Sequence, residues 1–230
     1  MVTSKVNVEK ASTKGEEGIV KKIKILIVDD HSMVREGVKM YLGFDPILEV
    51  VGEASNGEEA LEQAEKLQPD VVLMDLIMPV LDGVTTIGQM KKRHPDIEII
   101  ALTSVLEDEK VVGAVQAGAI GYLLKDSKPQ ELIDAIHAAG RGEVRLHPEA
   151  AKRLMRQVKT PDMRESLTPR ETDILKMIGR GYSNKDVSKE LDLSEYTVKA
   201  HVSSLLSKLG LSSRTQAALF ALKQGLVGLE

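Results

Sequence analysis

Short apolar runs alternate with amphipathic, helix-like segments from residue 22 to residue 141. The apolar runs predict strands at residues 23–28, 48–53, 70–75, 97–103 and 120–124. The segments that follow them predict helices at residues 33–42, 56–67, 83–93, 107–117 and 129–139. Five strand–helix units at this spacing indicate a parallel sheet that is covered on both faces. We therefore expect a doubly wound, flavodoxin-like α/β domain with five strands over residues 22–141.

Signals for helix ends support these boundaries. Ser32 and Asn56 suit N-caps because their side chains can accept a bond from a free backbone N–H group. Pro129 suits the first helical position after Lys128. Gly140 and Gly142 then end the last of these helices and open a linker.

The pattern becomes purely helical after residue 166. Helices are predicted at about residues 168–180, 183–190, 195–209 and 213–224. This predicts an all-α domain of four helices over residues 166–230. Residues 142–165 are expected to form a linker, with a short basic helix at 147–160.

The first 21 residues are rich in Lys, Glu, Gly, Ser and Thr and contain no apolar core of a secretory signal. We expect residues 1–21 to form a disordered extension. No apolar run approaches the roughly 18 residues of a membrane span. The absence of cysteine excludes disulfides and thiolate metal sites, which agrees with a reducing cytoplasm.

The overall charge of −4 hides an asymmetry between the two parts of the chain. Residues 22–141 contain 12 basic and 21 acidic side chains, a net charge of −9. Residues 166–230 contain 9 basic and 7 acidic side chains, a net charge of +2. This difference suggests separate partners for the two domains. The basic excess is too small to indicate nucleic-acid binding by itself.

Acidic and polar residues stand at the ends of four predicted strands. They are Asp29 and Asp30 after the first, Asp75 at the end of the third, Thr103 at the end of the fourth and Lys125 after the fifth. Ligands of an open parallel sheet bind outside the carboxyl ends of its strands. Three carboxylates gathered there would repel one another without a cation, and with Mg²⁺ they become an oxygen cage. The sequence therefore predicts a site that can hold a phosphoryl group.

Each of these residues has a candidate role in phosphoryl chemistry. Asp75 can act as a nucleophile toward phosphorus and form an acyl phosphate. Asp29 and Asp30 would hold Mg²⁺, Lys125 would pair with a phosphate oxygen, and Thr103 would donate a hydroxyl hydrogen bond. Strand-end Asp and Thr residues often serve only as caps, but four different strands with such ends favour a site. His31 adjoins the carboxylates, and because Mg²⁺ prefers oxygen we expect it to be a loop residue beside the pocket.

Residues 22–141 resemble the receiver domain of two-component response regulators. The resemblance rests on residues 27–31 (IVDDH), 72–79 (VLMDLIMP), 82–83 (DG), 102–104 (LTS) and 117–126 (AGAIGYLLKD). It implies that Asp75 accepts a phosphoryl group from a phosphohistidine of a sensor kinase. It also implies Mg²⁺ on Asp30 and Asp75, on Asp29 directly or through water, and on the backbone carbonyl of Ile77. Thr103 and Tyr122 match the family's switch pair. Asp126 departs from the proline of many receivers and is common in one subfamily.

The predicted helix at 195–209 has two contrasting faces, and Ser194 precedes it as an N-cap. Its apolar stripe, at helical spacing, consists of Val198, Val202, Leu205, Leu206 and Leu209. Its opposite face consists of Tyr196, Lys199, Ala200, Ser203 and Ser207. Small and polar residues around one lysine suit the recognition helix of a helix-turn-helix, which approaches the floor of the major groove. The pattern fits a solvated helix face equally well.

Residues 166–225 resemble the LuxR-type DNA-binding domain. The resemblance rests on residues 167–171 (LTPRE), 181–185 (GYSNK), 197–202 (TVKAHV), 207–210 (SKLG) and 214–217 (RTQA). It implies that Lys199, Ala200 and Ser203 face base edges. It places near DNA phosphates the residues Asn184, Thr197, His201, Lys208 and Arg214. For His201 a structural role is an open alternative. Tyr196 and Ser203 lack the charge found in other members, so affinity would depend more on dimerisation.

Together these resemblances predict a response regulator of the NarL/FixJ subfamily: a phosphorylation-controlled transcription factor, not an enzyme. The expected partners are a sensor histidine kinase, double-stranded DNA and, after phosphorylation, a second copy of the chain. A phosphohydrolase is the main alternative, but it would need an acid/base carboxylate two residues after Asp75, where Ile77 stands. A regulator that is never phosphorylated is the other alternative, and the intact set of Asp29, Asp30, Asp75 and Lys125 argues against it.

Overall fold

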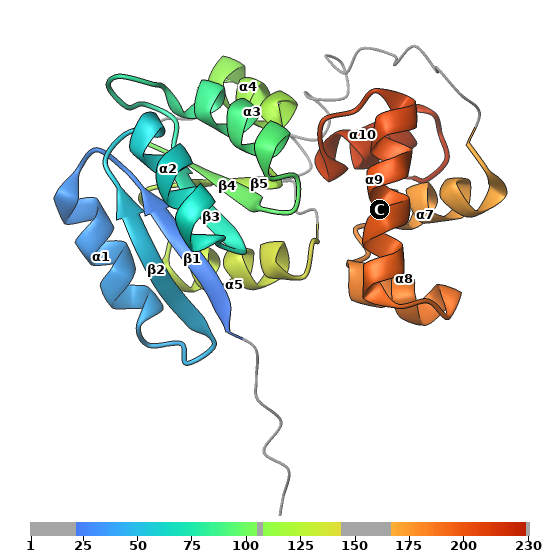
Figure 1. Ribbon diagram of the computed structural model, residues 1–230, viewed down its shortest axis with the longest axis horizontal. Helices are drawn as coiled ribbons and strands as arrows, with labels where there is room; N and C mark the ends of the chain where they lie inside the picture. Colours follow the sequence, from blue (N-terminus) through green and yellow to red (C-terminus); the bar gives the residue numbers. More distant parts are fainter. Residues whose placement is uncertain (1–21, 105–107, 144–166, 229–230) are drawn as a thin grey trace, which may run out of the picture.

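The chain folds into a sheet domain and a helical domain (Figure 1). The computed structural model describes residues 22–104, 108–143 and 167–228. The expectations for residues 1–21 and for the linker helix at 147–160 lie outside these residues. Among the described residues, no helix combines the length and the apolar character needed to cross a membrane.

A parallel five-stranded sheet forms the centre of the first domain. Its strands are β1 (Ile23–Val28), β2 (Leu48–Ala54), β3 (Val71–Asp75), β4 (Glu98–Thr103) and β5 (Gly121–Leu124). Their order in space is β2-β1-β3-β4-β5, and every neighbouring pair is parallel. The order reverses direction after β1, so β1 and β3 flank the switch point of a doubly wound fold. The predicted fold class is therefore confirmed.

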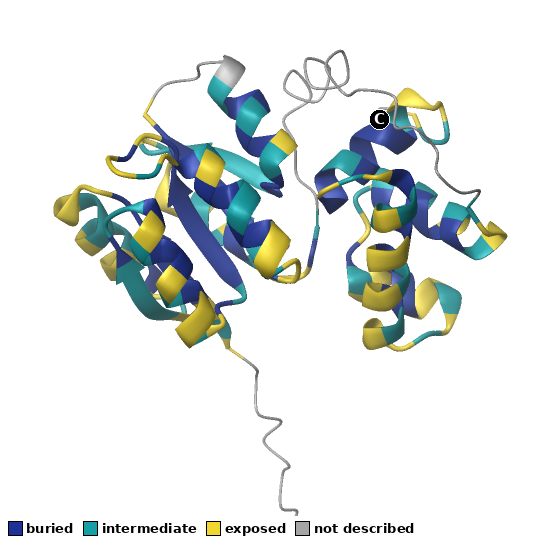
Figure 2. Cartoon of the chain, turned by 45° about the horizontal axis from the view of Figure 1, so that its top comes forward, coloured by how far each residue is buried: buried dark blue, intermediate teal, exposed yellow. Residues whose placement is uncertain are grey.

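Helices cover both faces of this sheet, as predicted. They are α1 (Ser32–Leu42), α2 (Gly57–Leu67), α3 (Gly83–Arg93), α4 (Asp108–Ala117) and α5 (Pro129–Gly140). Leu26 and Val28 of β1 pack into the core beneath α2, α3 and α4. Ile25 and Ile27 point to the other face and pack beneath α1 and α5. Successive strand residues thus enter different cores, which explains the continuous apolar runs. The central strands are accordingly buried along most of their length (Figure 2).

The helix ends follow the sequence signals with one exception. Asn56 caps α2 by accepting a bond from the Glu59 N–H at 3.0 Å. Pro129 opens α5, as expected. Ser32, however, is the first residue of α1 rather than its N-cap. His31 takes the N-cap position, and its side chain makes no capping bond because it turns to the neighbouring carboxylates.

The second domain consists of helices around one apolar core. In the described part of the chain these helices are α7 (Pro169–Gly179), α8 (Asn184–Leu191), α9 (Glu195–Leu209) and α10 (Arg214–Lys223). The core includes Ile174 and Ile178 of α7, Val198 and Leu205 of α9, and Phe220 of α10. The all-α prediction is confirmed, and each helix boundary lies within one residue of the predicted one.

Hydrogen bonds at the start of α10 join the two domains. Thr215 Oγ1 donates to the backbone carbonyl of Ala119 at 3.0 Å, and Thr215 is fully buried. The side chains of Ser212 and Gln216 both donate to the carbonyl of Gln116, at 3.1 and 2.6 Å. The receiving segment is the end of α4 and the turn into β5. We call these three bonds the domain seam.

Candidate functional site: a carboxylate pocket and a helix-turn-helix surface

The ends of three strands bring Asp29, Asp75 and Lys125 together. Asp29 follows β1, Asp75 ends β3, and Lys125 follows β5. The Lys125 ammonium lies 2.7 Å from Asp29 Oδ2 and 2.7 Å from Asp75 Oδ2. This edge of the sheet therefore gathers the three residues from positions 46 and 50 apart in the sequence.

The charged side chains of this pocket are buried, so water screens their electrostatic interactions only weakly. The Asp29 and Asp75 side chains are 0% and 3% exposed, and the Lys125 side chain is 15% exposed. Burial raises the pKa of Asp75, and it outweighs the hydrogen bond from Lys125. The pKa of Lys125 is also raised: burial acts against the charge, but hydrogen bonds to Asp29 and Asp75 overcome it. One ammonium is shared by two buried carboxylates, so a negative charge remains uncompensated.

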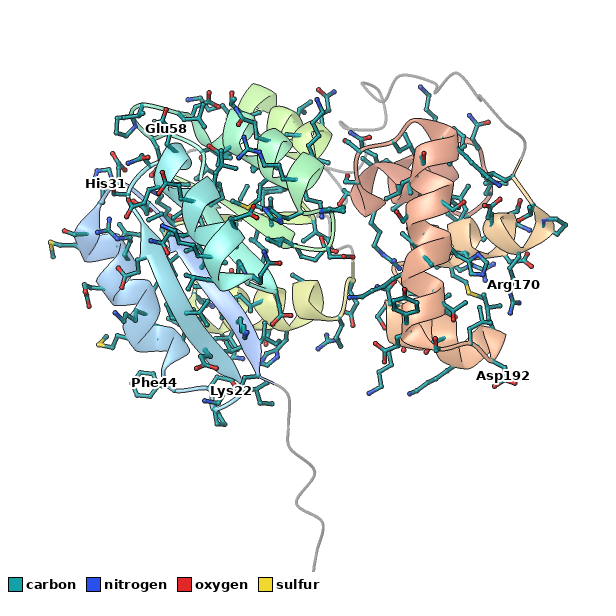
Figure 3. The ribbon with its side chains drawn as sticks, in the orientation of Figure 1. Lys22, His31, Phe44, Glu58, Arg170 and Asp192 are labelled. Atoms are coloured by element: carbon teal, nitrogen blue, oxygen red, sulfur yellow. The ribbon has the colours of Figure 1, made fainter. Side chains whose placement is uncertain are left out.

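A third carboxylate and an imidazole complete the pocket at its open side. Asp30 and His31 begin the loop after β1, and His31 Nδ1 lies 2.7 Å from Asp30 Oδ1. The His31 side chain is 67% exposed, and Figure 3 shows it at the end of α1 nearest the pocket. One ligand atom from each of Asp29, Asp30, His31 and Asp75 lies within 4.8 Å of the others. A set dominated by carboxylate oxygens fits a hard divalent cation such as Mg²⁺.

The loop after β3 holds Asp75 from its other side. The Ile77 N–H donates to Asp75 Oδ1 at 3.1 Å, so the two carboxylate oxygens have different partners. Asp82 caps α3 by accepting the Thr85 N–H at 2.9 Å. Gly83 packs so closely that a Cβ atom there would lie 2.0 Å from the Asp75 carbonyl oxygen. Glycine is therefore required for α3 to begin directly against the end of β3.

The predicted switch residues lie on the β4–β5 side of the pocket. Thr103 ends β4 and is 1% exposed. The backbone N–H of Lys125 donates to the backbone carbonyl of Thr103 at 2.8 Å, and this bond joins the ends of β4 and β5. Tyr122 is partly buried and packs against the core on the α4 side of the sheet. It lies three residues after Ala119 of the domain seam.

One contact in the pocket was missed from the sequence. Arg35 of α1 donates from Nη1 to the backbone carbonyl of Asp29 at 2.7 Å. Arg35 lies six residues after Asp29, on the polar side of an amphipathic helix. Nothing in the sequence around it marks this arginine as different from one that faces solvent. The contact depends on how α1 lies against β2, which periodicity does not specify.

In the helical domain, α8 and α9 form a helix-turn-helix with well-defined caps. Ser183 and Asp186 form a reciprocal capping box at α8. Ser194 caps α9 by accepting the Thr197 N–H at 3.1 Å, as predicted. The apolar stripe of α9 is buried at Val198, Val202, Leu205 and Leu209. The turn between α8 and α9 includes Asp192, whose φ is +52°, and it sets α9 across α8.

The opposite face of α9 is open. Lys199, Ala200 and Ser203 are exposed, and Tyr196 is 83% exposed. The domain seam is made by α10 and the turn before it, and this face of α9 takes no part in it. The arrangement presents one lysine among small and polar side chains, which suits a close approach to DNA.

The residues predicted near DNA phosphates have partners within the domain. Lys208 lies 2.9 Å from the buried carboxylate of Glu171. Arg214 is 6% exposed and donates to the Asn184 side chain at 2.8 Å and to the Tyr182 carbonyl. Burial lowers the pKa of Arg214 to about 10. Thr197 Oγ1 pairs with Ser194 Oγ, and His201 is half-buried. These contacts give each of Lys208, Arg214, Asn184 and Thr197 a structural role.

Two family models match the chain. The model described as "Response regulator receiver domain" matches residues 25–137, and "Bacterial regulatory proteins, luxR family" matches residues 165–221. The transcriptional regulatory protein LiaR of Bacillus subtilis is 44% identical over 209 residues, which cover 89% of this chain and 99% of the relative. The response regulator protein VraR of Staphylococcus aureus (strain Mu3) is 42% identical over 206 residues, with the same coverage.

Solved structures agree with these matches. The solved complex of the two-component response regulator RcsB with DNA is 25% identical to this chain, with a TM-score of 0.53. The match covers 88% of this chain and 99% of that chain. The doubly wound domain with its acidic pocket and the helix-turn-helix define a receiver joined to a DNA-binding domain. The chain belongs to the two-component response regulators that carry a LuxR-type DNA-binding domain. Members of this family are DNA-binding regulators of transcription, not enzymes.

Proposed function

We propose that Asp75 is the residue that accepts the phosphoryl group, from a phosphohistidine of a sensor histidine kinase. The observation that carries this is the Lys125 ammonium, 2.7 Å from the carboxylates of both Asp75 and Asp29. A carboxylate oxygen of Asp75 would form the new O–P bond while the N–P bond of the donor breaks and the histidine keeps its electron pair. Lys125 would then pair with a phosphoryl oxygen, and Thr103 would donate to another.

Mg²⁺ is the proposed cofactor of this step. The carboxylates of Asp29, Asp30 and Asp75 and the carbonyl of Ile77 would hold it. When bound, Mg²⁺ neutralises negative charge on the phosphoryl oxygens. The uncompensated charge of the pocket and its oxygen-rich ligand set support this choice. Asp75 phosphorylation would shift Thr103 toward the phosphoryl group and turn the Tyr122 ring inward.

The intact mass of the protein tests this proposal. Incubation with acetyl phosphate and Mg²⁺ should add one phosphoryl group to the wild type and none to Asp75→Asn, which lacks the nucleophilic oxygen. Asp134→Asn, on the exposed side of α5, is the matched control and should be phosphorylated like the wild type. An Asp75→Asn protein that still gains the mass would rule out Asp75. Rapid release of phosphate without a lasting adduct would favour the phosphohydrolase.

For the second domain we propose that α9 reads double-stranded DNA. Lys199, Ala200 and Ser203 would face base edges, and the open face of α9 supports this. Backbone phosphates would be contacted by Asn184, Thr197, His201, Lys208 and Arg214. Because Lys208 and Arg214 also hold the domain together, their phosphate contacts would require those side chains to share or exchange partners.

Phosphorylation is proposed to raise DNA affinity by forming a homodimer in the cytoplasm. The domain seam supports a closed monomer as the starting state, since it fixes α10 to the segment just before Tyr122. A change at Tyr122 would then weaken the seam and free the helical domain to pair on two half-sites.

Light scattering with and without beryllium fluoride, together with a DNA titration, tests this step. The activated protein should double its mass and bind more tightly. An activated protein that remains monomeric in solution and on DNA, yet binds more tightly, would remove dimerisation and leave only release of the seam.

A further inference from the structure

Arg35 links three elements around the first strand end. It lies on α1, and its side chain is 18% exposed. Nη1 donates to the Asp29 carbonyl at 2.7 Å, and Nε donates to Glu53 Oε2 of β2 at 3.2 Å. α1 runs alongside β2 in Figure 1, so the guanidinium spans from the edge strand to the end of β1. Both of its contacts are therefore directed at fixed backbone and sheet positions.

The carbonyl that Arg35 contacts has a special position. It belongs to the peptide that joins Asp29 to Asp30, the two carboxylates from the first strand end. Asp29 is held independently by its N–H bond to Ala54 and by Lys125. Asp30 begins the loop, is more exposed and depends on the orientation of this peptide for the direction of its side chain. A bond to the carbonyl restricts rotation of that peptide.

Glu53 fixes the orientation of the Arg35 guanidinium. One oxygen of Glu53 accepts from Arg35, and the other lies 2.8 Å from the ammonium of Lys39, one helical turn further along α1. Two cations on one carboxylate keep Glu53 charged, and the planar guanidinium can bond Glu53 and the Asp29 carbonyl at the same time. Lys39 has no contact with the Asp29 carbonyl among the bonds of the described residues.

We infer that Arg35 is a positioning residue for the carboxylate pocket: it fixes the Asp29–Asp30 peptide so that both carboxylates meet one divalent cation. This inference rests on the proposed role of the pocket as a metal site. Arg35 bonds to Glu53 and to the Asp29 carbonyl, so it would act on the cation through this peptide. Groups that hold a ligand in place in this way commonly change metal affinity by 10- to 100-fold when they are lost.

The sign of the effect separates positioning from charge. A cation near a metal site repels the metal, so removing Arg35 should tighten metal binding if only its charge mattered. If Arg35 positions the carboxylates, removing it should weaken metal binding. Lys39 provides the matched control, because it has the same charge, the same helix and the same partner, Glu53, but no bond to the peptide.

Titration of Mn²⁺ followed by its free EPR signal, with Mg²⁺ as competitor, measures the affinity directly and without phosphorylation. We expect Arg35→Met to raise the Mn²⁺ Kd by about 10-fold or more. Lys39→Met should leave the Kd within about 2-fold of the wild type or lower it. Unchanged or tighter binding by Arg35→Met, or equal weakening by both variants, would overturn the inference.

A second pair of variants covers the case in which Arg35→Met does not fold. Arg35→Lys retains the charge, but its single ammonium cannot serve Glu53 and the carbonyl together, so the Kd should still rise. Lys39→Arg should bind like the wild type. Equal Kd values for these two variants would overturn the inference in the same way.

Asp30→Asn distinguishes the possible failures. If the wild type binds Mn²⁺, Asp30→Asn does not and Arg35→Met binds normally, the metal site stands and only the role of Arg35 is wrong. If Asp30→Asn binds as tightly as the wild type, the pocket is not the metal site. The proposed cofactor then fails, and the inference about Arg35 fails with it.

Discussion

In the receiver pocket, Asp29 and Asp75 are buried around a single ammonium, whereas in the helical domain Glu171 is buried with a full set of partners. Glu171 accepts bonds from the Thr168 backbone, from Ser204 and from Lys208. The pKa values of the two groups differ accordingly: burial raises the pKa of Asp75, while these bonds lower the pKa of Glu171 to about 2. The fold therefore stabilises the charge of Glu171 but compensates that of Asp75 only in part, because Asp75 shares the Lys125 ammonium with Asp29.

This difference separates two kinds of buried carboxylate. A residue whose charge the fold satisfies contributes to stability, and its removal should be costly. A residue whose charge the fold leaves unsatisfied is available for a ligand, and its removal should cost chemistry and not stability. Substitutions of Glu171, Lys125 and Asp75 test the distinction, and a substitution of Lys199 tests the exposed face of α9.

The largest effect is expected for Glu171→Ala. Loss of this carboxylate removes three bonding partners and leaves Lys208 unpaired, so the unfolding free energy should fall by about 3 kcal/mol. Urea unfolding followed by circular dichroism measures the change. Asp173→Ala, an exposed neighbour on α7, is the control and should cost less than about 0.5 kcal/mol. Equal losses for the two variants would contradict the structural role of Glu171.

The lowered pKa of Glu171 also predicts that the stability of the protein depends on pH. The pKa of Glu171 is about 2 in the folded chain against 4.5 ordinarily, first because of the Thr168 N–H bond. A lowered folded pKa gives stability that is present above about pH 4.5 and is lost as the pH falls toward 2. The difference in stability between the wild type and Glu171→Gln should therefore shrink between pH 5 and pH 3. A constant difference would contradict this assignment.

Lys125→Met should slow phosphorylation while Asp75 remains available as the acceptor. Without the ammonium, the pocket loses the side-chain cation that would pair with the incoming phosphoryl group beside Mg²⁺, and the rate of phosphorylation by acetyl phosphate should fall about 100-fold. Lys128→Met, three residues further along and exposed, is the control and should retain the wild-type rate. The measurement is the growth of the phosphorylated mass with time. A rate within a factor of three of the wild type would remove Lys125 from the mechanism.

Lys199→Ala tests the open face of α9. Operator affinity should fall by about 1–3 kcal/mol if the side chain contacts a base edge. The melting temperature should barely change, because Lys199 lies opposite the buried stripe. Lys66→Ala, an exposed lysine of α2, controls for the loss of one positive charge. Affinity equal to that of Lys66→Ala would reject the role in recognition.

The smallest effect carries the opposite sign. Asp75→Asn removes an unfavourable buried charge, so it should raise the unfolding free energy by roughly 1 kcal/mol while abolishing phosphorylation. Urea unfolding in the absence of Mg²⁺ measures it. A loss of stability would show that Asp75 is satisfied by the fold in the same way as Glu171, and the comparison between the two carboxylates would then fail.

The fold could be predicted from the sequence almost completely because its signals are local. Buried parallel strands are continuous apolar runs, and helix ends carry caps such as Asn56 and Ser194. Convergence of Asp29, Asp75 and Lys125 also follows from pattern, since the carboxyl ends of parallel strands share one edge. The partners of exposed-looking side chains do not follow. Ser32 was expected as a cap, but the competing attraction of Asp30 for His31 decides the geometry there.

Two side-chain contacts between residues far apart in the sequence were also missed, because they depend on tertiary packing. The bonds from Arg35 to Asp29 and from Lys208 to Glu171 depend on the angle between packed helices and strands. In the structure, Thr168 and Glu171 form a capping box at the start of α7. That Glu171 also faces α9 is visible only once the two helices are packed.

The domain seam has a consequence for how such chains can diverge. All three of its bonds run from side chains of Ser212, Thr215 and Gln216 to main-chain carbonyls of Gln116 and Ala119. Every residue type presents a carbonyl, so the receiver can change its side chains along this turn without losing an acceptor. The identity of the seam is encoded on one partner alone. A hybrid with a foreign receiver should therefore keep it, provided that the backbone of the turn is preserved.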